Sequence, residues 1–148
     1  MERSDVQPSK TPDTDSVSAR ADFLGTRFEG RIRTTDFAGK TFLECTFSNC
    51  AIRDADFTDA QFIRTTFTHT ALVDATFDRA LFSGCRAADC DFSYAGAAHT
   101  RIEHAAFERV TFLGSTFWQA SLNDVSLLDS SFEKGTFREM HGFPEFLR

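Results

Sequence analysis

Four cysteines are the first candidates for chemistry in this 148-residue sequence. They form two equally spaced pairs, Cys45 with Cys50 and Cys85 with Cys90. Such pairs can bind a metal or form a disulfide, but this spacing matches no zinc motif. All four also occupy a small-residue position in a five-residue repeat, where cysteine acts as a compact hydrophobe. We therefore expect reduced, buried thiols and neither a metal nor a cofactor.

A histidine and an aspartate are the second candidates, as a general base. His69 belongs to a series with a spacing of twenty residues that runs Asn49, His69, Asp89, Arg109, Asp129. No Ser or Cys nucleophile is placed to face the pair, and the sequence contains no phosphate-binding loop and no H-E-x-x-H motif. The alternating charges favour a surface salt-bridge ladder. We expect no enzymatic activity, with an enzyme or small-molecule binder kept as an alternative.

The acidic residues are the third candidates. The chain has 22 acidic and 16 basic residues, for a net charge of -6. This balance argues against a general binder of nucleic acids or anionic membranes. One face of the predicted fold gathers six carboxylates, diluted by Lys40, Arg53 and Arg79. They are Asp36, Asp54, Asp56, Asp59, Asp74 and Asp78. Two interpretations stay open: a solvated face, or an imitation of the phosphate rows of a duplex that attracts a basic protein groove.

The element that must position these residues is a repeat rich in phenylalanine, of which the chain has 18. Every fifth residue from Phe37 to Phe137 is apolar, and the residue two places before it is small, with Lys40 the exception. The remaining three positions carry nearly all the charge. A period of five fits neither a helix nor a strand. It requires a chain that turns a corner in every pentad and returns each large side chain to one axis.

The pentads resemble the pentapeptide repeat family, as in residues 55–59 (ADFTD) and 90–94 (CDFSY). The resemblance covers residues 21–139. It implies an all-β, right-handed quadrilateral β-helix of about six coils, with four pentads per coil. Phenylalanines twenty residues apart should then stack on one another. Characterised members of the family include quinolone-resistance and antibiotic self-immunity factors that look like B-form DNA, dimerise through their C-terminal ends and bind DNA gyrase or topoisomerase IV.

Three segments follow from this organisation: a disordered tail at 1–20, the β-helix at 21–139 and a cap or dimer segment at 140–148. The step from Phe28 to Ile32 is four residues, so either a tight corner absorbs the deletion or the first coil is irregular. The sequence has no apolar run long enough to predict a transmembrane helix or a signal peptide. We therefore expect a cytoplasmic protein. The cap or dimer residues are Met140, Phe143, Phe146 and Leu147.

Two apolar features fall outside the core positions. Leu43, Ile63 and Leu81 share one outer face, and Trp118 lies near Arg138 at a distance that permits a cation–π contact. The sequence as a whole favours a non-enzymatic protein-binding scaffold. The alternative that the resemblance implies is a DNA mimic that binds DNA gyrase or topoisomerase IV and confers quinolone or antibiotic self-resistance.

Overall fold

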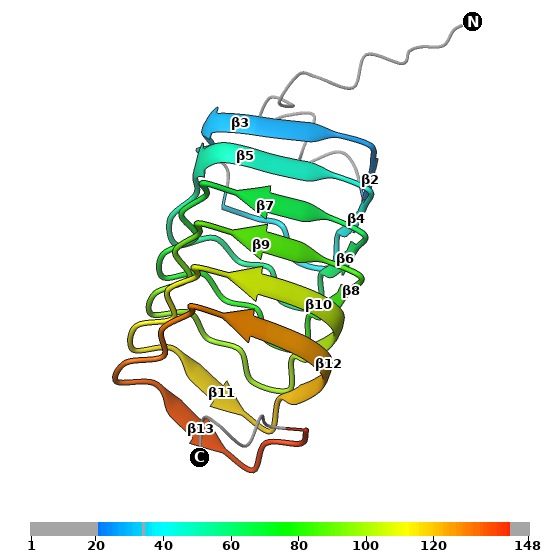
Figure 1. The fold of residues 1–148 in the computed structure, drawn as a ribbon. Coiled ribbons are helices and arrows are strands. Elements are labelled where there is room, and N and C mark those ends of the chain that lie inside the picture. Colours follow the sequence, from blue (N-terminus) through cyan, green and yellow to red (C-terminus); the bar gives the residue numbers. More distant parts are fainter. Residues whose placement is uncertain (1–20, 34, 143–148) are drawn as a thin grey trace, which may run out of the picture.

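The chain winds into a rectangular solenoid in which residues twenty apart lie side by side (Figure 1). A computed structural model describes residues 21–33 and 35–142. Every strand pairing in this part of the chain is parallel. The strands are β2 (Asp22–Leu24), β3 (Arg27–Arg31), β4 (Thr41–Leu43), β5 (Thr46–Ala51), β6 (Gln61–Ile63), β7 (Thr66–Thr68), β8 (Leu81–Ser83), β9 (Arg86–Ala88), β10 (Arg101–Glu108), β11 (Thr116–Trp118), β12 (Ser121–Leu128) and β13 (Thr136–Arg138).

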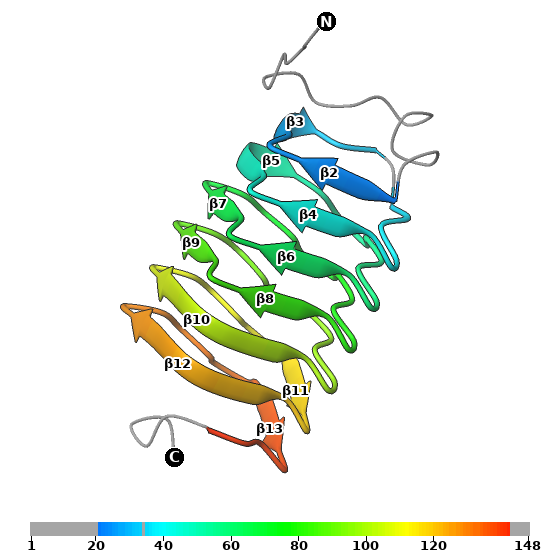
Figure 2. The same ribbon diagram turned by 90° about the vertical axis from the view of Figure 1, so that its right-hand side faces the viewer.

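Each coil contributes one pentad to each of four faces (Figure 2). The first face is formed by β2, β4, β6, β8 and the first halves of β10 and β12, and the second face by β3, β5, β7, β9 and the other halves. The third face is held by single bridges such as Ala51 with Ala71 and Ala71 with Asp91. The fourth face begins with the bridge of Asp36 to Asp56 and ends in β11 and β13. The predicted all-β solenoid of about six coils is confirmed.

Corners between faces use a left-handed backbone. In the described part of the chain, eighteen non-glycine residues have φ between 47° and 61°, and nearly all of them are the fifth residue of a pentad. This conformation is unfavourable for an L-residue. A backbone hydrogen bond between coils offsets this conformational free energy. Asp74 N–H, for example, donates to the Ser93 carbonyl of the next coil at 3.0 Å. The fifth residue therefore projects its side chain from a rigid edge.

Stacked phenylalanine rings fill the inside of the solenoid, as the repeat predicts. Phe42 and Phe62 are parallel with ring centroids 4.9 Å apart, and Phe37 and Phe57 are 4.8 Å apart. Rings on adjacent faces of the same coil meet edge-on or tilted, as Phe23 and Phe28 do at 5.4 Å. Both arrangements are favourable for aromatic quadrupoles. The faces of the solenoid are thereby held at a fixed separation along its length.

The four-residue step near the N-terminus is absorbed locally. The pairing of β3 with β5 shifts register between Glu29 and Gly30, and Gly30 has a φ of +79° that glycine adopts without strain. Ile32 N–H then donates to the Ala51 carbonyl at 3.2 Å, so the next coil is again in register. Among residues 21–33 and 35–142 there is no helix of the length and apolarity that a membrane crossing needs.

Candidate functional site

The six predicted carboxylates lie on the fourth face and its two bordering corners, and we call this set the acidic face. Asp36 and Asp56 are bridged neighbours on successive coils, and Asp78 lies on the third of these coils. Asp54 and Asp74 occupy the corner that leads into the face, with φ of 55° and 61°. Asp59 (φ 60°) occupies the corner that leads out of it. The structure thus brings the six residues together on one side of the rod.

Backbone hydrogen bonds orient three of these carboxylates. Asp56 Oδ1 accepts the N–H of Thr58 at 2.9 Å, and Asp36 Oδ1 accepts the N–H of Ala38 at 3.3 Å. Asp78 Oδ1 accepts the N–H of Ala98, one coil further on, at 3.1 Å. In each of the three, the oxygen that accepts the bond is Oδ1. The negative charges are therefore fixed in place before any partner arrives.

Arginines neutralise part of the acidic face. Arg79 binds both oxygens of Asp59, at 2.9 and 3.2 Å, and lowers the pKa of that carboxyl. Arg53 lies 3.5 Å from Asp74. Within the described residues, the remaining four carboxylates form no ion pair; they are Asp36, Asp54, Asp56 and Asp78. The face therefore keeps a net negative charge, concentrated on the coils nearest the N-terminus.

The histidine series forms the charge ladder. Both carboxylate oxygens of Asp89 are held by Arg109, at 2.6 and 3.0 Å, and this pairing lowers the pKa of Asp89. His69, which is exposed, is one coil from Asp89, and both oxygens of that carboxylate already bind Arg109. A second rung of the same kind joins His104 Nδ1 to Asp124 at 2.9 Å on a different corner. These pairings join adjacent coils along the corners.

All four cysteines are buried thiols outside any disulfide, in the small-residue position that the repeat assigns to them. Their sulfur atoms contact backbone carbonyl oxygens, as Cys85 Sγ does with Phe62 O at 3.1 Å. Burial raises the pKa of Cys50, Cys85 and Cys90 to about 11. Thiols of this kind react slowly because the thiolate is the nucleophile. Their position fits a packing role.

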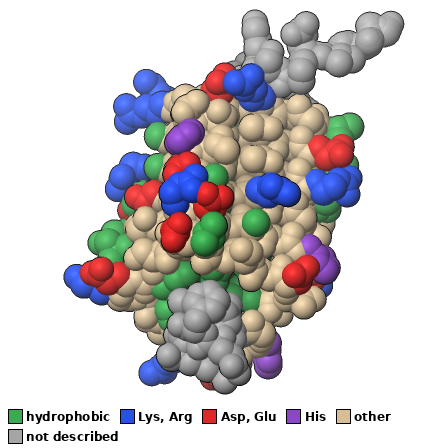
Figure 3. Space-filling model, in the orientation of Figure 1, with side chains coloured by type: hydrophobic (Ala, Val, Ile, Leu, Met, Phe, Trp, Pro, Cys, Tyr) green, Lys and Arg blue, Asp and Glu red, His purple; other side chains and the backbone are tan. Residues whose placement is uncertain are grey.

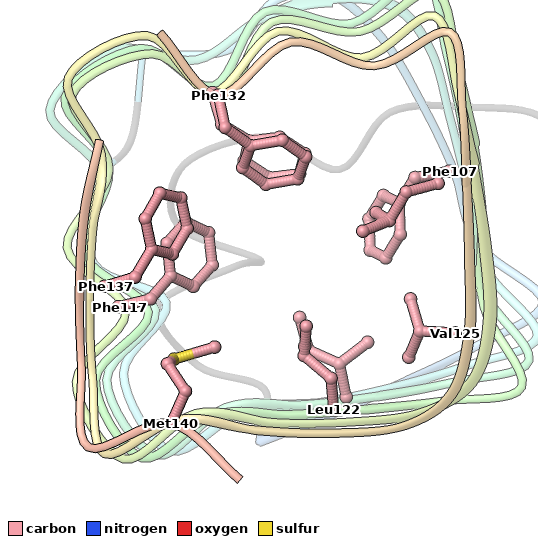
Figure 4. Close-up of a pocket in the computed structure, with 10 residues that line it drawn as sticks. Phe107, Phe117, Leu122, Val125, Phe132, Phe137 and Met140 are labelled. Atoms are coloured by element: carbon pink, nitrogen blue, oxygen red, sulfur yellow. The ribbon is translucent and has the colours of Figure 1, made fainter. Parts of the chain in front are cut away.

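The C-terminal end of the rod carries the second predicted surface. Met140 lies in the small-residue position of the last coil and points inward beside Phe117, Phe137 and Leu122, around a cavity of about 10 Å³ (Figure 4). The last apolar side chains are only half-buried: Val125, Leu127, Phe132, Phe137 and Met140. The other predicted cap residues, Phe143, Phe146 and Leu147, lie outside the described residues.

The three apolar residues predicted to share an outer face, Leu43, Ile63 and Leu81, all lie on the first face. Leu43 and Ile63 are direct neighbours, and Leu81 lies opposite Gln61, two places along the strand. Leu24 extends the column on the other side, opposite Leu43, and is 66% exposed. Leu24 has the same position in its own pentad but precedes the regular register, so the twenty-residue count did not predict it.

Trp118 lies directly opposite Arg138, as predicted, yet the contacts described for its indole involve other residues. The ring meets His99 edge-on at 5.1 Å, and the indole N–H donates to Glu139 at 3.4 Å. His99 and Glu139 occupy the fifth position of their pentads, so the ring packs along the corner. The corner residues of adjacent coils therefore determine where the indole lies.

A sequence profile described as "Pentapeptide repeats" matches eight copies in residues 41–79 and 60–95. The same five-residue geometry continues beyond these limits, from Phe37 to Phe137, in the structure. Residues 41–95 therefore consist of pentapeptide repeats, and the chain has the fold that such repeats form. No curated protein matches its sequence with significance.

Two solved structures share this fold. A trypsin-treated form of QnrB1, a plasmid-mediated fluoroquinolone resistance protein, aligns with a TM-score of 0.55 and 18% identity over 75% of this chain and 69% of that one. Full-length QnrB1 aligns with a TM-score of 0.50 and 16% identity, over 82% and 85% of the two chains. At this level of identity the likeness is one of architecture.

Proposed function

We propose that this protein is a non-enzymatic binding scaffold whose acidic face docks on a basic groove of a protein partner. The observation that carries the proposal is the row of carboxylates on successive coils, of which Asp36, Asp56 and Asp78 are oriented by backbone hydrogen bonds. Preorganised charge costs little ordering entropy on binding. It also accelerates the encounter with a surface of opposite sign.

A protein that binds duplex DNA is the partner that suits this surface best. Its groove is basic and shaped to a rod that carries regularly spaced negative charge on its outside. The acidic face is one side of such a rod. Four of its carboxylates, on the N-terminal coils, form no ion pair within the described residues. DNA gyrase and topoisomerase IV are the specific candidates, because the same architecture occurs in QnrB1, a fluoroquinolone resistance protein. A role in quinolone or antibiotic self-resistance would follow from that binding.

The test measures gyrase supercoiling and topoisomerase IV relaxation with added protein, in the presence and absence of a quinolone. We expect the wild type to change either activity at micromolar concentration. Asp54→Lys/Asp74→Lys should weaken the effect, because it reverses two charges at corner positions where Lys134 already shows that lysine is accommodated. Added salt should weaken it further. Asp22→Lys/Glu133→Lys is the matched control, since it makes the same charge change on other faces.

The outcomes separate the two levels of the proposal. If the wild type leaves both enzymes unaffected at micromolar concentration, neither enzyme is the partner. The wider scaffold role is then tested with the same three proteins as baits in a pull-down. Proteins retained by the wild type and the control but lost from the acidic-face variant would support it. If all three baits retain the same proteins, the acidic face serves solubility alone.

The C-terminal end supports a second contact, between two copies of this chain. Five half-buried apolar side chains lie there, and within residues 21–33 and 35–142 one edge of β12 and β13 pairs only through the bridge of Ser121 to His141. Figure 3 shows hydrophobic side chains at this end of the molecule. Joining two such ends would cover both cores and lengthen the rod. Sedimentation of the full chain as a dimer, and of a variant lacking residues 140–148 as a monomer, is the expected result; a monomeric full chain would contradict it.

A further inference from the structure

Three arginines gather at the N-terminal end of the third face, away from the acidic face. Arg31 and Arg33 flank Ile32, and because alternate residues of an extended chain point to the same side, both project outward while Ile32 is buried. Arg31 pairs with Ala51 on the next coil, which places Arg53 beside Arg33. Basic side chains protrude at the left edge of the view in Figure 3, level with the ends of β3 and β5.

These residues surround an open hollow of about 740 Å³, lined by Arg31, Ile32, Arg33, Ala51 and Arg53. Its apolar lining comes from Ala51, which is exposed, whereas the Ile32 side chain belongs to the core. Small residues create the space: Ala51 and then Ala71 follow Arg31 along this column. The volume falls in the range of small-molecule sites, roughly 300–1,000 Å³. We call this feature the arginine hollow.

The arginines of the hollow differ from the arginines at the corners in the residues that they face on the next coil. Arg64, Arg79 and Arg109 each bind an acidic residue exactly one coil away on the same corner. The residues one coil from Arg31 and Arg33 are instead an alanine and another arginine. Arg53 approaches Asp74 at 3.5 Å, and in the described part of the chain neither Arg31 nor Arg33 has an ion pair. The hollow therefore concentrates positive charge for which the fold supplies only one nearby carboxylate.

We infer that the arginine hollow binds a small phosphate monoester. Guanidinium groups bind phosphate oxygens in pairs and are weakly hydrated, so several can converge on one phosphate at small cost. An anion of this kind would relieve the repulsion among the three arginines. The exposed methyl group of Ala51 offers a contact for the organic part, which a free inorganic ion lacks. This inference does not depend on the acidic face or on any protein partner.

Calorimetric titration of the full chain with adenosine monophosphate and with inorganic phosphate tests the inference. We expect saturable one-to-one binding, tighter for the nucleotide than for inorganic phosphate. Arg31→Ala/Arg33→Ala should weaken nucleotide binding by about tenfold or more, as the loss of charge-assisted hydrogen bonds requires. Arg86→Ala/Arg101→Ala is the matched control, because it removes the same charge from other faces. It should leave the affinity within about twofold.

Several results would overturn the inference. Equal weakening by the two double variants would show that only net charge attracts the ligand. No saturable heat at millimolar nucleotide would show that there is no site. Tighter binding of a polyglutamate peptide than of the nucleotide would identify the hollow as a docking surface for acidic protein. If Arg31→Ala/Arg33→Ala loses its β-sheet circular dichroism, Arg31→Gln/Arg33→Gln, which keeps the aliphatic part of the side chain and a polar end without the charge, replaces it with the same expected loss.

Discussion

A ring inside the core and a ring in its last coil show what the stacked arrangement requires. Phe42 lies between Phe23 at 5.2 Å and Phe62 at 4.9 Å and is fully buried. Phe137 stacks on Phe117 at 5.4 Å and is only half-buried. The side chain is the same in both places, and the difference comes from the coils beside it. In a solenoid each repeat is stabilised mainly by its neighbours, so the last coil is the weakest part of the core.

The middle of the rod differs from the N-terminal coils in another way. Ala87 and Ala97 stand where the stacks would carry phenylalanine, and a void of about 20 Å³ borders Ala97. Phe92 fills part of the space and meets Phe67 edge-on at 6.1 Å. On its other side Phe67 has a parallel ring, Phe47, at 4.9 Å. The stacks are therefore continuous through the first coils and interrupted in the fourth. Rings above and below this interruption have fewer partners.

The largest expected effect compares a fully buried ring, Phe57, with a half-buried one, Phe137. Phe57→Ala removes a fully buried ring stacked at 4.8 and 5.1 Å and should lower the free energy of unfolding by about 3–5 kcal/mol. Phe137→Ala should cost about 1–2 kcal/mol, because part of the ring already contacts solvent. Urea denaturation of both variants measures the difference. Equal losses would show that the last coil is as well covered as the interior.

A smaller effect concerns hydroxyl groups in one small-residue column. Thr70 is buried, and its Oγ1 donates to the Phe47 carbonyl at 3.1 Å, so Thr70→Val leaves a buried acceptor short of a bond. We expect a loss of about 1–2 kcal/mol. Ser130 occupies the same column in the last coil and is half-buried, with its Oγ 3.3 Å from the Leu128 carbonyl. Ser130→Ala should cost under about 0.5 kcal/mol, since water can replace the bond; the reverse order would contradict this account.

The smallest expected effect is the loss of stability on removing a corner ion pair, and it should be equal in the two halves of the rod. Arginines lower the pKa of Asp59 and Asp89 below the ordinary value of 3.8, so each pair adds stability above that pH and loses it as the pH falls through the lowered pKa. Asp59→Asn and Asp89→Asn should each reduce the urea midpoint slightly at pH 7, because exposed pairs contribute little. Neither variant should differ from the wild type at a pH well below the lowered values. A deficit that persists in acid would point to packing as its cause.

The regular part of the fold could be predicted because the repeat allows one solution. A period of five places every large side chain on the axis, and the twenty-residue spacing then determines stacking partners such as Phe37 and Phe57. It also predicts which fifth-position residues meet, as Asp89 and Arg109 do. The clustering of the six carboxylates followed from the same count, because each face repeats once per coil.

Features that break the repeat were harder to predict. The void beside Ala97 depends on how far Phe92 can turn, which a pattern of residue types does not contain. The position of Trp118 depended on two corner residues, His99 and Glu139, more than on Arg138 opposite. The hydrogen bonds that orient Asp36, Asp56 and Asp78 arise from backbone geometry within and between pentads. The arginine hollow could be recognised only once the structure placed Arg31 opposite Ala51 on the next coil.

Because neighbouring coils share a twenty-residue register, the length of the solenoid can be changed by whole coils. Leu81 and Arg101 are neighbours in register on successive coils, as are Phe82 and Ile102. Removing residues 81–100 would therefore join Ala80 to Arg101 with the strands already aligned. Each such step moves the acidic face about 4.8 Å closer to the C-terminal end, while both surfaces keep their own residues. The distance between two binding surfaces is thus a variable that this architecture can tune independently of what each surface recognises.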